Sequence, residues 1–492
     1  NFSFAGTWKS GVSDITGDNA IFQKIKNSQW ELKNYFNQLY TKEKYTWGIR
    51  SYIRYTHCPA SLTVAHRNLP ILFADNMLIA NCIYHRNELS SPDNISENTY
   101  RTVIGQTHES ILAEYEEMNT GNAYTDNVLY GMRKINGVNY QLTGGFCGEL
   151  SSVKQENAYS AHSYSFYTVP RIEWERNDFL FTAATTVRWS HLPKQSYSRF
   201  CVSPFFCFRY KFTPRWKMSL LGSLDESEGG LKDIYPFRYR EDYRTVVKHT
   251  GKVPVTVRQL YTCYLEYKNT IKEFFWTLSA SYSHNRYNLI TERNYKDGNF
   301  YLSSVERNHS SHSYTLNTIG SKGIYDWNLK TSLELTLARN EGKQLNEGIV
   351  QDYRYDYLCI EPKIVWAPSV FFEAEYKATV SCVGGGIGED TSLDPLWEVA
   401  QRLTLSLEFH DTEFRLSGEH FYNDLSKNQH LNIWLADVSL IHKVGKWRFA
   451  ASAINLFNKE QYRYTLYSAV QSYTSWIKLR PREFMVSVQY QW

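Results

Sequence analysis

From about residue 165 to the end, the sequence repeats one pattern: apolar and polar residues alternate for the length of a strand, then a short turn follows and the alternation resumes. In one example, Phe206, Phe208 and Tyr210 alternate with Arg209 before the chain turns at 213–215. A period of two places successive side chains on opposite faces of a strand. The pattern therefore predicts antiparallel hairpins with one apolar and one polar face. Further short turns are predicted at Asn177-Asp178, Asn269-Thr270, Lys322-Gly323, 367–369, Asp411-Thr412 and 444–446.

The composition favours a membrane β-barrel over a set of soluble domains. At 492 residues the chain is long enough for either. Aromatic residues make up 16% of the chain and 38 residues are tyrosines, yet the mean hydropathy is −0.49. No run of 18 or more apolar residues occurs, which excludes a transmembrane helix. A barrel needs no such run, because every second residue faces water and the aromatic girdles at both membrane interfaces use Tyr, Trp and Phe.

The connections between the predicted strands alternate between short turns and longer polar segments. This asymmetry is typical of outer-membrane barrels, which have short periplasmic turns and longer extracellular loops, whereas a β-sandwich or propeller would have more even connections. We therefore predict an all-β fold: a large transmembrane antiparallel β-barrel of about 20–22 strands, formed as a single domain by residues 1–492. The long loops are predicted at roughly 225–258, 284–311, 339–356, 384–401, 421–431 and 456–480.

The first third of the chain gives a weaker pattern. Residues 1–12 already read as a barrel strand, and a second alternating segment contains Trp30 and ends at the polar turn 41–44, after which Tyr45–Tyr55 alternates again. Between 57 and 165 the pattern is poor. The segment Ile111–Met118 is compatible with a strand or a short loop helix. Elsewhere in this region we predict an alternating piece at Met77–Arg86, a long loop at ELSSPDNISEN and a two-residue hairpin turn at Asn136-Gly137.

The last nine residues, FMVSVQYQW, form the clearest single strand. Phe484, Val486 and Val488 lie on one face with Tyr490 and Trp492, and the intervening residues are mostly polar. An aromatic residue at the carboxyl terminus, with another two positions before it, resembles the strand that closes outer-membrane barrels. The apolar face is then expected to meet lipid and the polar face the lumen.

The carboxyl-terminal region also resembles a family. The segment INLFNKEQY, the aromatic-rich connection after it and the strand that begins RPREF are similar to the carboxyl-terminal end of TonB-dependent receptors, especially the Bacteroidetes type. Asn455–Asn458 match the NLF(N/D) pattern of the family and Arg480–Phe484 match its closing strand. The resemblance implies a 22-stranded barrel in the bacterial outer membrane. It also implies uptake of a scarce nutrient (a metal chelate, glycan or peptide), driven by the inner-membrane energy coupler.

One departure from the family leaves two functions open. Family members carry an amino-terminal plug domain, and nothing in residues 1–12 matches one; no secretory leader follows Asn1 either. The chain is expected to be the barrel of a longer receptor, or a barrel without a plug. The leading hypothesis is a nutrient transporter. The alternative is a structural or assembly subunit of a multiprotein outer-membrane complex. Expected partners are outer-membrane lipids, a surface lipoprotein, other complex subunits, and TonB only if a plug precedes this chain.

No catalytic, cofactor or metal site is predicted, and the protein is not expected to be an enzyme. The formal charge of +4 gives no argument for nucleic acid. The spacing of His57, Cys58 and His66 fits no usual zinc pattern. The glycine run 384–388 lacks the setting of a phosphate loop and is expected to be a flexible loop. The acidic residues Glu389, Asp390 and Asp394 lack calcium-loop spacing, and the eight cysteines (Cys58, Cys82, Cys147, Cys201, Cys207, Cys263, Cys359 and Cys382) show no zinc or disulfide spacing.

The charged residues opposite the apolar faces are expected to form a mutually neutralising lining of the lumen, not a substrate site. They are Arg50, Arg54, Arg171, Glu173, Glu175, Arg209, Lys211, Glu373, Glu375, Lys377 and Glu408.

Overall fold

The structure, a computed structural model, describes ten ranges of the chain: 2–16, 21–42, 45–66, 113–155, 158–241, 245–297, 299–388, 391–426, 429–467 and 472–490. The predictions for Met77–Arg86, for the ELSSPDNISEN segment and for Cys82, Glu389, Asp390 and Trp492 lie outside these ranges. Within them, no helix is both long and apolar enough to cross a membrane.

The described residues are almost entirely β-strand. The first half of the chain forms β1 (Phe2–Thr16), β2 (Ile21–Lys42), β3 (Tyr45–His66), β4 (Ala113–Ile135), β5 (Val138–Lys154), β6 (Ala158–Arg176), β7 (Phe179–Leu192), η3 (Pro193–Gln195), β8 (Tyr197–Lys211), β9 (Trp216–Glu228), α3 (Leu231–Ile234), β10 (Tyr239–Arg240) and β11 (Thr245–Lys248). The second half forms β12 (Val255–Asn269), β13 (Phe274–Lys296), β14 (Asn299–Ile324), η4 (Tyr325–Trp327), β15 (Leu329–Asn346), β16 (Ile349–Ser369), β17 (Phe372–Ile387), β18 (Thr391–Phe409), β19 (Thr412–Ser426), β20 (Gln429–Val444), β21 (Trp447–Ile454), β22 (Gln461–Tyr467), β23 (Ser472–Lys478) and β24 (Glu483–Tyr490).

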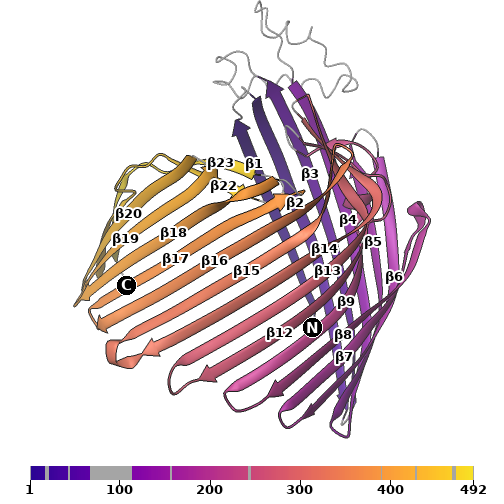
Figure 1. Ribbon diagram of the computed structural model, residues 1–492, viewed down its shortest axis with the longest axis horizontal. Helices are drawn as coiled ribbons and strands as arrows, with labels where there is room; N and C mark the ends of the chain where they lie inside the picture. Colours follow the sequence, from indigo (N-terminus) through magenta and orange to yellow (C-terminus); the bar gives the residue numbers. More distant parts are fainter. Residues whose placement is uncertain are drawn as a thin grey trace, which may run out of the picture.

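One sheet makes up the wall of the molecule, antiparallel except for the short parallel pairings of β11 with β14 and of β13 with β15, which confirms the all-β prediction. In the described part of the chain the sheet has 22 strands, including the two short strands β10 and β11, and β22 pairs with β23 in a separate ribbon. Figure 1 shows the sheet curling into a barrel-shaped wall, with the strands of the second half in front of β1–β3. Among the described residues β1 pairs with β2 and β24 with β21, and no backbone pairing joins β1 to β24.

The two faces of the wall differ as the alternation predicted. On the outward face, large apolar side chains are exposed along most strands; Phe484 and Val486 of β24 are 74% and 80% exposed. The alternate positions face the lumen and are mostly polar. Directly paired residues of neighbouring strands share a face, so the apolar rows continue from strand to strand around the wall.

Most of the predicted long loops are instead hairpins in which the strands continue to a tight turn. Residues 284–311 belong to β13 and β14, and residues 339–356 to β15 and β16, which turn at Glu347 and Gly348 with φ of 48° and 79°. The prediction was wrong because it used alternation to recognise strands. A ribbon that extends beyond the wall contacts water on both faces, so its sequence is polar throughout and loses the period of two. The described parts of 384–401 and 421–431 are likewise mostly strand, since β17 and β18 reach Ile387 and Thr391 and β19 and β20 reach Ser426 and Gln429, whereas longer connections remain between β9 and β12 and between β21 and β24.

Several turns also differ in detail from the prediction. Asn136-Gly137 forms its predicted turn, with φ of 47° and 82°. Lys322-Gly323 lies inside β14, and the chain turns three residues later through η4 and Asn328, whose φ is 48°. Pro368 lies in β16 at a register shift, and that turn follows at 370–371. Residues 113–118 are strand, which resolves the open choice for that part of Ile111–Met118.

The glycine run at 384–386 is part of β17 and not a flexible loop. A Cβ atom at Gly385 would lie 2.1 Å from the backbone oxygen of Arg354, so only glycine fits this close approach of two strands. At Gly384 the nearest atom to a Cβ would be 3.9 Å away.

The glycine pair gives a matched test of this contact. Gly385→Ala is expected to destabilise the protein by about 1–3 kcal/mol, because the backbone of Arg354 must move to accept the methyl group. Gly384→Ala is expected to be close to neutral. Urea unfolding of both variants in the same detergent would measure the difference, and equal midpoints would contradict the predicted backbone contact.

Candidate functional site in the lumen

The connection between β9 and β12 (residues 229–254) packs against the lumen face of the wall. Ile234 and Tyr235, at the end of α3, are 1% and 2% exposed. Together with Val253 of the connection, they pack against a patch of inward-facing residues on β5, β6 and β7: Val153, Tyr159, Ala161 and Leu192. This cluster is an apolar core inside an otherwise polar lumen, and it docks the connection onto the wall.

Hydrogen bonds from the backbone and from one asparagine side chain fix the same connection at its base and at its far side. The amide of Gly229 donates to the oxygen of Pro254 at 2.8 Å, which closes the base. Asn288 holds the exit, because its Oδ1 accepts from the Val255 amide at 2.7 Å and its Nδ2 donates to the Val253 oxygen at 2.9 Å. Asn288 lies at the register shift of β13, a bulge that re-aims its side chain. On the far side β11 pairs in parallel with β14.

Burial in this connection raises the pKa of Tyr239 to about 12, with the nearby carboxylates Glu241 and Asp233 acting in the same direction. A phenol whose pKa is higher in the docked state stabilises docking below its ordinary pKa of about 10, and this contribution is lost as the pH rises towards 12. Cleavage of the connection by an alkaline-tolerant protease is therefore expected to accelerate between about pH 10 and 12. Tyr239→Phe should show a smaller acceleration; an unchanged pH profile would contradict the assignment.

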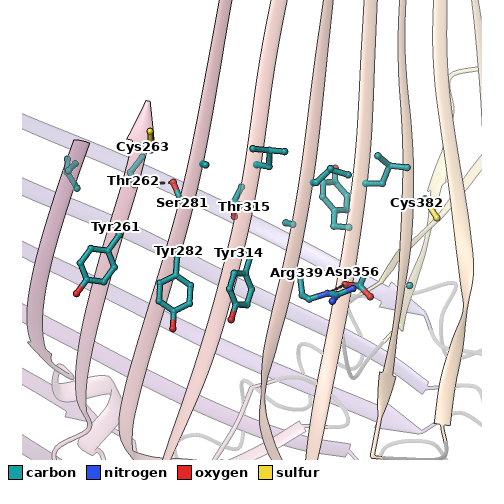
Figure 2. A pocket seen from close by; sticks show the side chains of 18 of the residues that line it. Tyr261, Thr262, Cys263, Ser281, Tyr282, Tyr314, Thr315, Arg339, Asp356 and Cys382 are labelled. Carbon is teal, nitrogen blue, oxygen red and sulfur yellow. Dashed lines mark hydrogen bonds and ion pairs between the residues drawn. The ribbon is translucent and has the colours of Figure 1, made fainter. Parts of the chain in front are cut away.

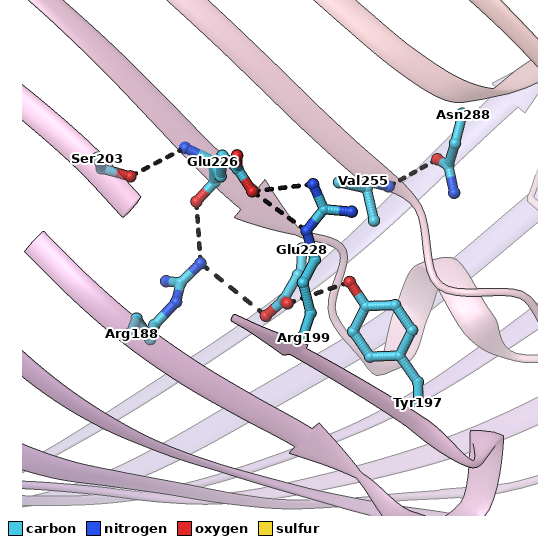
Figure 3. Close-up of polar contacts among 8 residues, drawn as sticks. All are labelled: Arg188, Tyr197, Arg199, Ser203, Glu226, Glu228, Val255 and Asn288. Carbon is cyan, nitrogen blue, oxygen red and sulfur yellow. Dashed lines mark hydrogen bonds and ion pairs between the residues drawn. The ribbon is translucent and has the colours of Figure 1, made fainter. Parts of the chain in front are cut away.

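A cluster of charged side chains fills the gap where β8 and β9 separate. The backbone pairing of β8 with β9 ends at Phe205 and Ser223, and Figure 3 shows the charged residues that lie beyond this point. Arg199 donates from Nε and Nη2 to Oε2 of Glu226 at 3.1 and 2.9 Å. Arg188 Nη2 donates to the backbone oxygen of Glu226 at 2.9 Å and lies 3.9 Å from Glu228, which also accepts from the Tyr197 hydroxyl at 3.2 Å. Because the charges are paired with one another, the cluster serves to join the two strands.

Below the connection, the lumen face of β13 and β14 carries uncharged hydrogen-bonding groups. The inward positions of these two strands are hydroxyl or amide residues over five and four successive positions: Thr277, Ser279, Ser281, Ser283 and Asn285, and Ser311, Ser313, Thr315 and Asn317. Four of these residues (Ser283, Asn285, Ser311 and Ser313) line part of a cavity of about 640 Å³ with Tyr287, Tyr353 and the facing pair Asp225 and Arg258. Asn285 Nδ2 donates to Ser311 Oγ at 3.3 Å, so the groups already form contacts with one another.

Of the eleven charges expected to line the lumen, four form ion pairs among the described residues: Arg54, Arg171, Glu173 and Glu375. Arg171 pairs with Glu173 at 2.8 Å and Glu375 with Lys363 at 3.4 Å. Arg54 lies 4.0 Å from Glu31. Sequence reasoning missed Glu31 and Lys363, and it also missed the hydroxyl and amide face, although the alternating Thr and Ser residues of TLSASYSHN carry that signal.

The residues considered as metal ligands do not come together. His57 packs 5.9 Å from the ring of Trp30, and His66 pairs with Ile21 at the other end of β3. Asp394 lies in β18. Among the described residues, no group of three or more His, Cys, Asp or Glu side chains could hold a metal ion, and the seven described cysteines are free thiols.

Comparison with known proteins found no matching protein-family model and no matching curated sequence. Solved structures of TonB-dependent receptor type resemble the chain over 99% of its length. The ferric yersiniabactin uptake receptor FyuA from Yersinia pestis is 10% identical, with 75% of that chain covered and a TM-score of 0.38. A variant of the ferric enterobactin receptor PfeA from Pseudomonas aeruginosa is 11% identical (69% covered, TM-score 0.42), and the copper transporter OprC is 9% identical (81% covered, TM-score 0.42). These values are too low to transfer a function.

Proposed function

We propose that the chain forms the barrel of a bacterial outer-membrane receptor that takes up a scarce nutrient. The observation that supports this most is the separation of the two faces: the outward face exposes large apolar side chains, while the lumen face is polar and holds a docked connection and a cavity. An outward apolar band around a polar interior is the arrangement that a membrane barrel requires.

The height of the apolar band supports membrane insertion. On β13 the aromatic residues Phe274 and Tyr282 bound the band, and eight residues correspond to ~26 Å along the strand at ~3.3 Å per residue. With a strand tilt of ~40°, the band is ~20 Å high, near the ~25 Å of outer-membrane barrels. The end with the connection 229–254 is then extracellular, and the tight turns at 212–215 and 270–273 are periplasmic.

The lumen suggests which nutrient class the receptor takes. The hydroxyl and amide face of β13 and β14 offers donors and acceptors without net charge, and Tyr287 and Tyr353 add aromatic surface. Of the three nutrient classes, this favours an uncharged polar solute such as a glycan over a highly charged metal chelate. Coupling to TonB and capture of the solute by a surface lipoprotein are part of this proposal and are not features of the described fold.

A growth experiment tests the transport function. Deleting the gene in its native host is expected to abolish growth on one class of nutrient among neutral oligosaccharides, peptides and ferric chelates. The wild-type chain, expressed within its full-length protein, should restore growth, whereas Ser283→Val with Asn285→Leu should not. Fractionation checks that each variant reaches the outer membrane. Normal growth on every class, together with stoichiometric co-purification of other outer-membrane proteins, would favour the structural-subunit alternative.

A further inference from the structure

The outward face carries a hollow that the transport function does not use. It has a volume of about 1020 Å³ and extends across β8, β9 and β12–β18 (Figure 2). Its floor is apolar, with Leu220, Leu316 and Leu337 around the smaller Cys263 and Ala280. Direct cross-strand pairing places Cys263 beside Ala280 and Leu220, so two short side chains lie side by side and leave the depression between longer neighbours.

A row of polar-tipped side chains borders this hollow on its extracellular side. Register pairs Tyr261 with Tyr282, Tyr282 with Tyr314, Tyr314 with Arg339 and Arg339 with Asp356. Figure 2 shows the three tyrosine rings side by side and the Arg339 and Asp356 pair continuing the row. Tyrosine rings at such a border present an apolar body to hydrocarbon and a hydroxyl to the polar interface.

Two guanidinium groups share one carboxylate at the end of this row. Arg339 Nε donates to Asp356 Oδ1 at 2.6 Å, and Arg354 Nε lies 3.0 Å from Asp356 Oδ2. Both arginine side chains are about half exposed. Both arginines contact this carboxylate through Nε, which leaves their Nη groups available to an external anion.

Further polar groups above the row add two more cations and two more carboxylates. Arg286 Nε donates to His284 Nε2 at 3.2 Å, and His284 contacts His312 at 3.3 Å between their Nδ1 atoms. Glu341 pairs in register with His312 and Arg354, and Lys343 forms an ion pair with Asp352 at 2.8 Å. The whole group therefore holds four cations (Arg286, Arg339, Lys343 and Arg354) against three carboxylates (Glu341, Asp352 and Asp356).

We propose that the hollow binds one phosphorylated acyl lipid of the outer leaflet. Its acyl chains fill the depression over Cys263 and Ala280, and its phosphate accepts hydrogen bonds from Arg339 and Arg354 above the tyrosine row. This site rests on the proposed membrane insertion but not on any substrate. Ordinary surrounding lipid would cover the same apolar surface without requiring a phosphate, so dependence on the phosphate distinguishes a specific site from general coverage.

Native mass spectrometry of the purified full chain in detergent tests the proposal. The probe is bisphosphorylated lipid A, compared with its phosphate-free form and with zwitterionic phosphatidylethanolamine. Wild type is expected to retain one lipid A molecule, and Arg339→Gln with Arg354→Gln should reduce the retained fraction about tenfold or more. Ala280→Trp should reduce it by filling the hollow. Arg133→Gln is the matched control, since Arg133 lies 4.7 Å from the Tyr45 ring at the opposite end of the wall.

These outcomes distinguish loss of the lipid site from loss of the folded barrel. Equal retention of the phosphate-free lipid, or unchanged retention by both the double variant and Ala280→Trp, would overturn the site. Heat-dependent gel migration of the same samples reports whether each variant is a folded barrel. A wild-type chain that shows no such migration would instead count against the proposed membrane insertion.

Discussion

Ala451→Arg is expected to destabilise the inserted protein by about 2–4 kcal/mol, because it places a cation on the outward face within the apolar band. Ala451 pairs with Leu440 and Val486, and its neighbours on this face are apolar. Urea unfolding of the protein in lipid vesicles would measure the change, with heat-dependent gel migration as a check of insertion.

The adjacent residue provides the control. Ala450 points to the lumen side of the same strand, so Ala450→Arg is expected to change the stability by no more than about 0.5 kcal/mol. A similar loss in both variants would mean that β21 is sensitive to any bulky charge, and the assignment of its faces would fail.

Ile234→Ala is expected to weaken docking of the connection 229–254 by about 2–5 kcal/mol, because Ile234 is almost fully buried among Tyr159, Leu192 and Val253. The change should raise the undocked population roughly 30-fold or more and leave the wall intact. Limited proteolysis within residues 229–254, combined with gel migration of the barrel, measures both quantities. Ile349→Ala, at an exposed hairpin tip, should leave the proteolysis unchanged; equal cleavage of the two variants would contradict the docked core.

The sequence predicted the wall better than what lies beyond or inside it. Wherever one face is apolar, as at Phe206 and Phe208, the period of two identified the strand and its outward face correctly. Beyond the apolar band, as in β13 above Tyr282, both faces are polar and no periodic signal remains, so strands were mistaken for loops. The prediction of Lys322-Gly323 as a turn failed for a related reason, since glycine in a strand reads like a turn when its neighbours are polar.

The candidate site was harder to predict because it depends on contacts between distant segments. Nothing near Ile234 in the sequence shows that it packs against Leu192, and the pairing of Arg199 with Glu226 depends on where β8 and β9 separate. The row from Tyr261 to Asp356 likewise arises only from the registers of five strands. A pattern within one strand predicts which face a residue takes, whereas a site requires the alignment of several strands.

The docked connection has a mechanical consequence for the barrel. It is held to β5, β6 and β7 by its apolar core and to β14 by the pairing of β11, so it joins two parts of the wall that are separated along the sheet. A wide sheet can flatten or widen with little change in its hydrogen bonds. A connection attached at two separate places instead fixes the distance between those two parts of the wall. The end of the wall that holds this connection is therefore expected to keep its shape near β5–β14, and any widening of that end should occur on the side away from the connection.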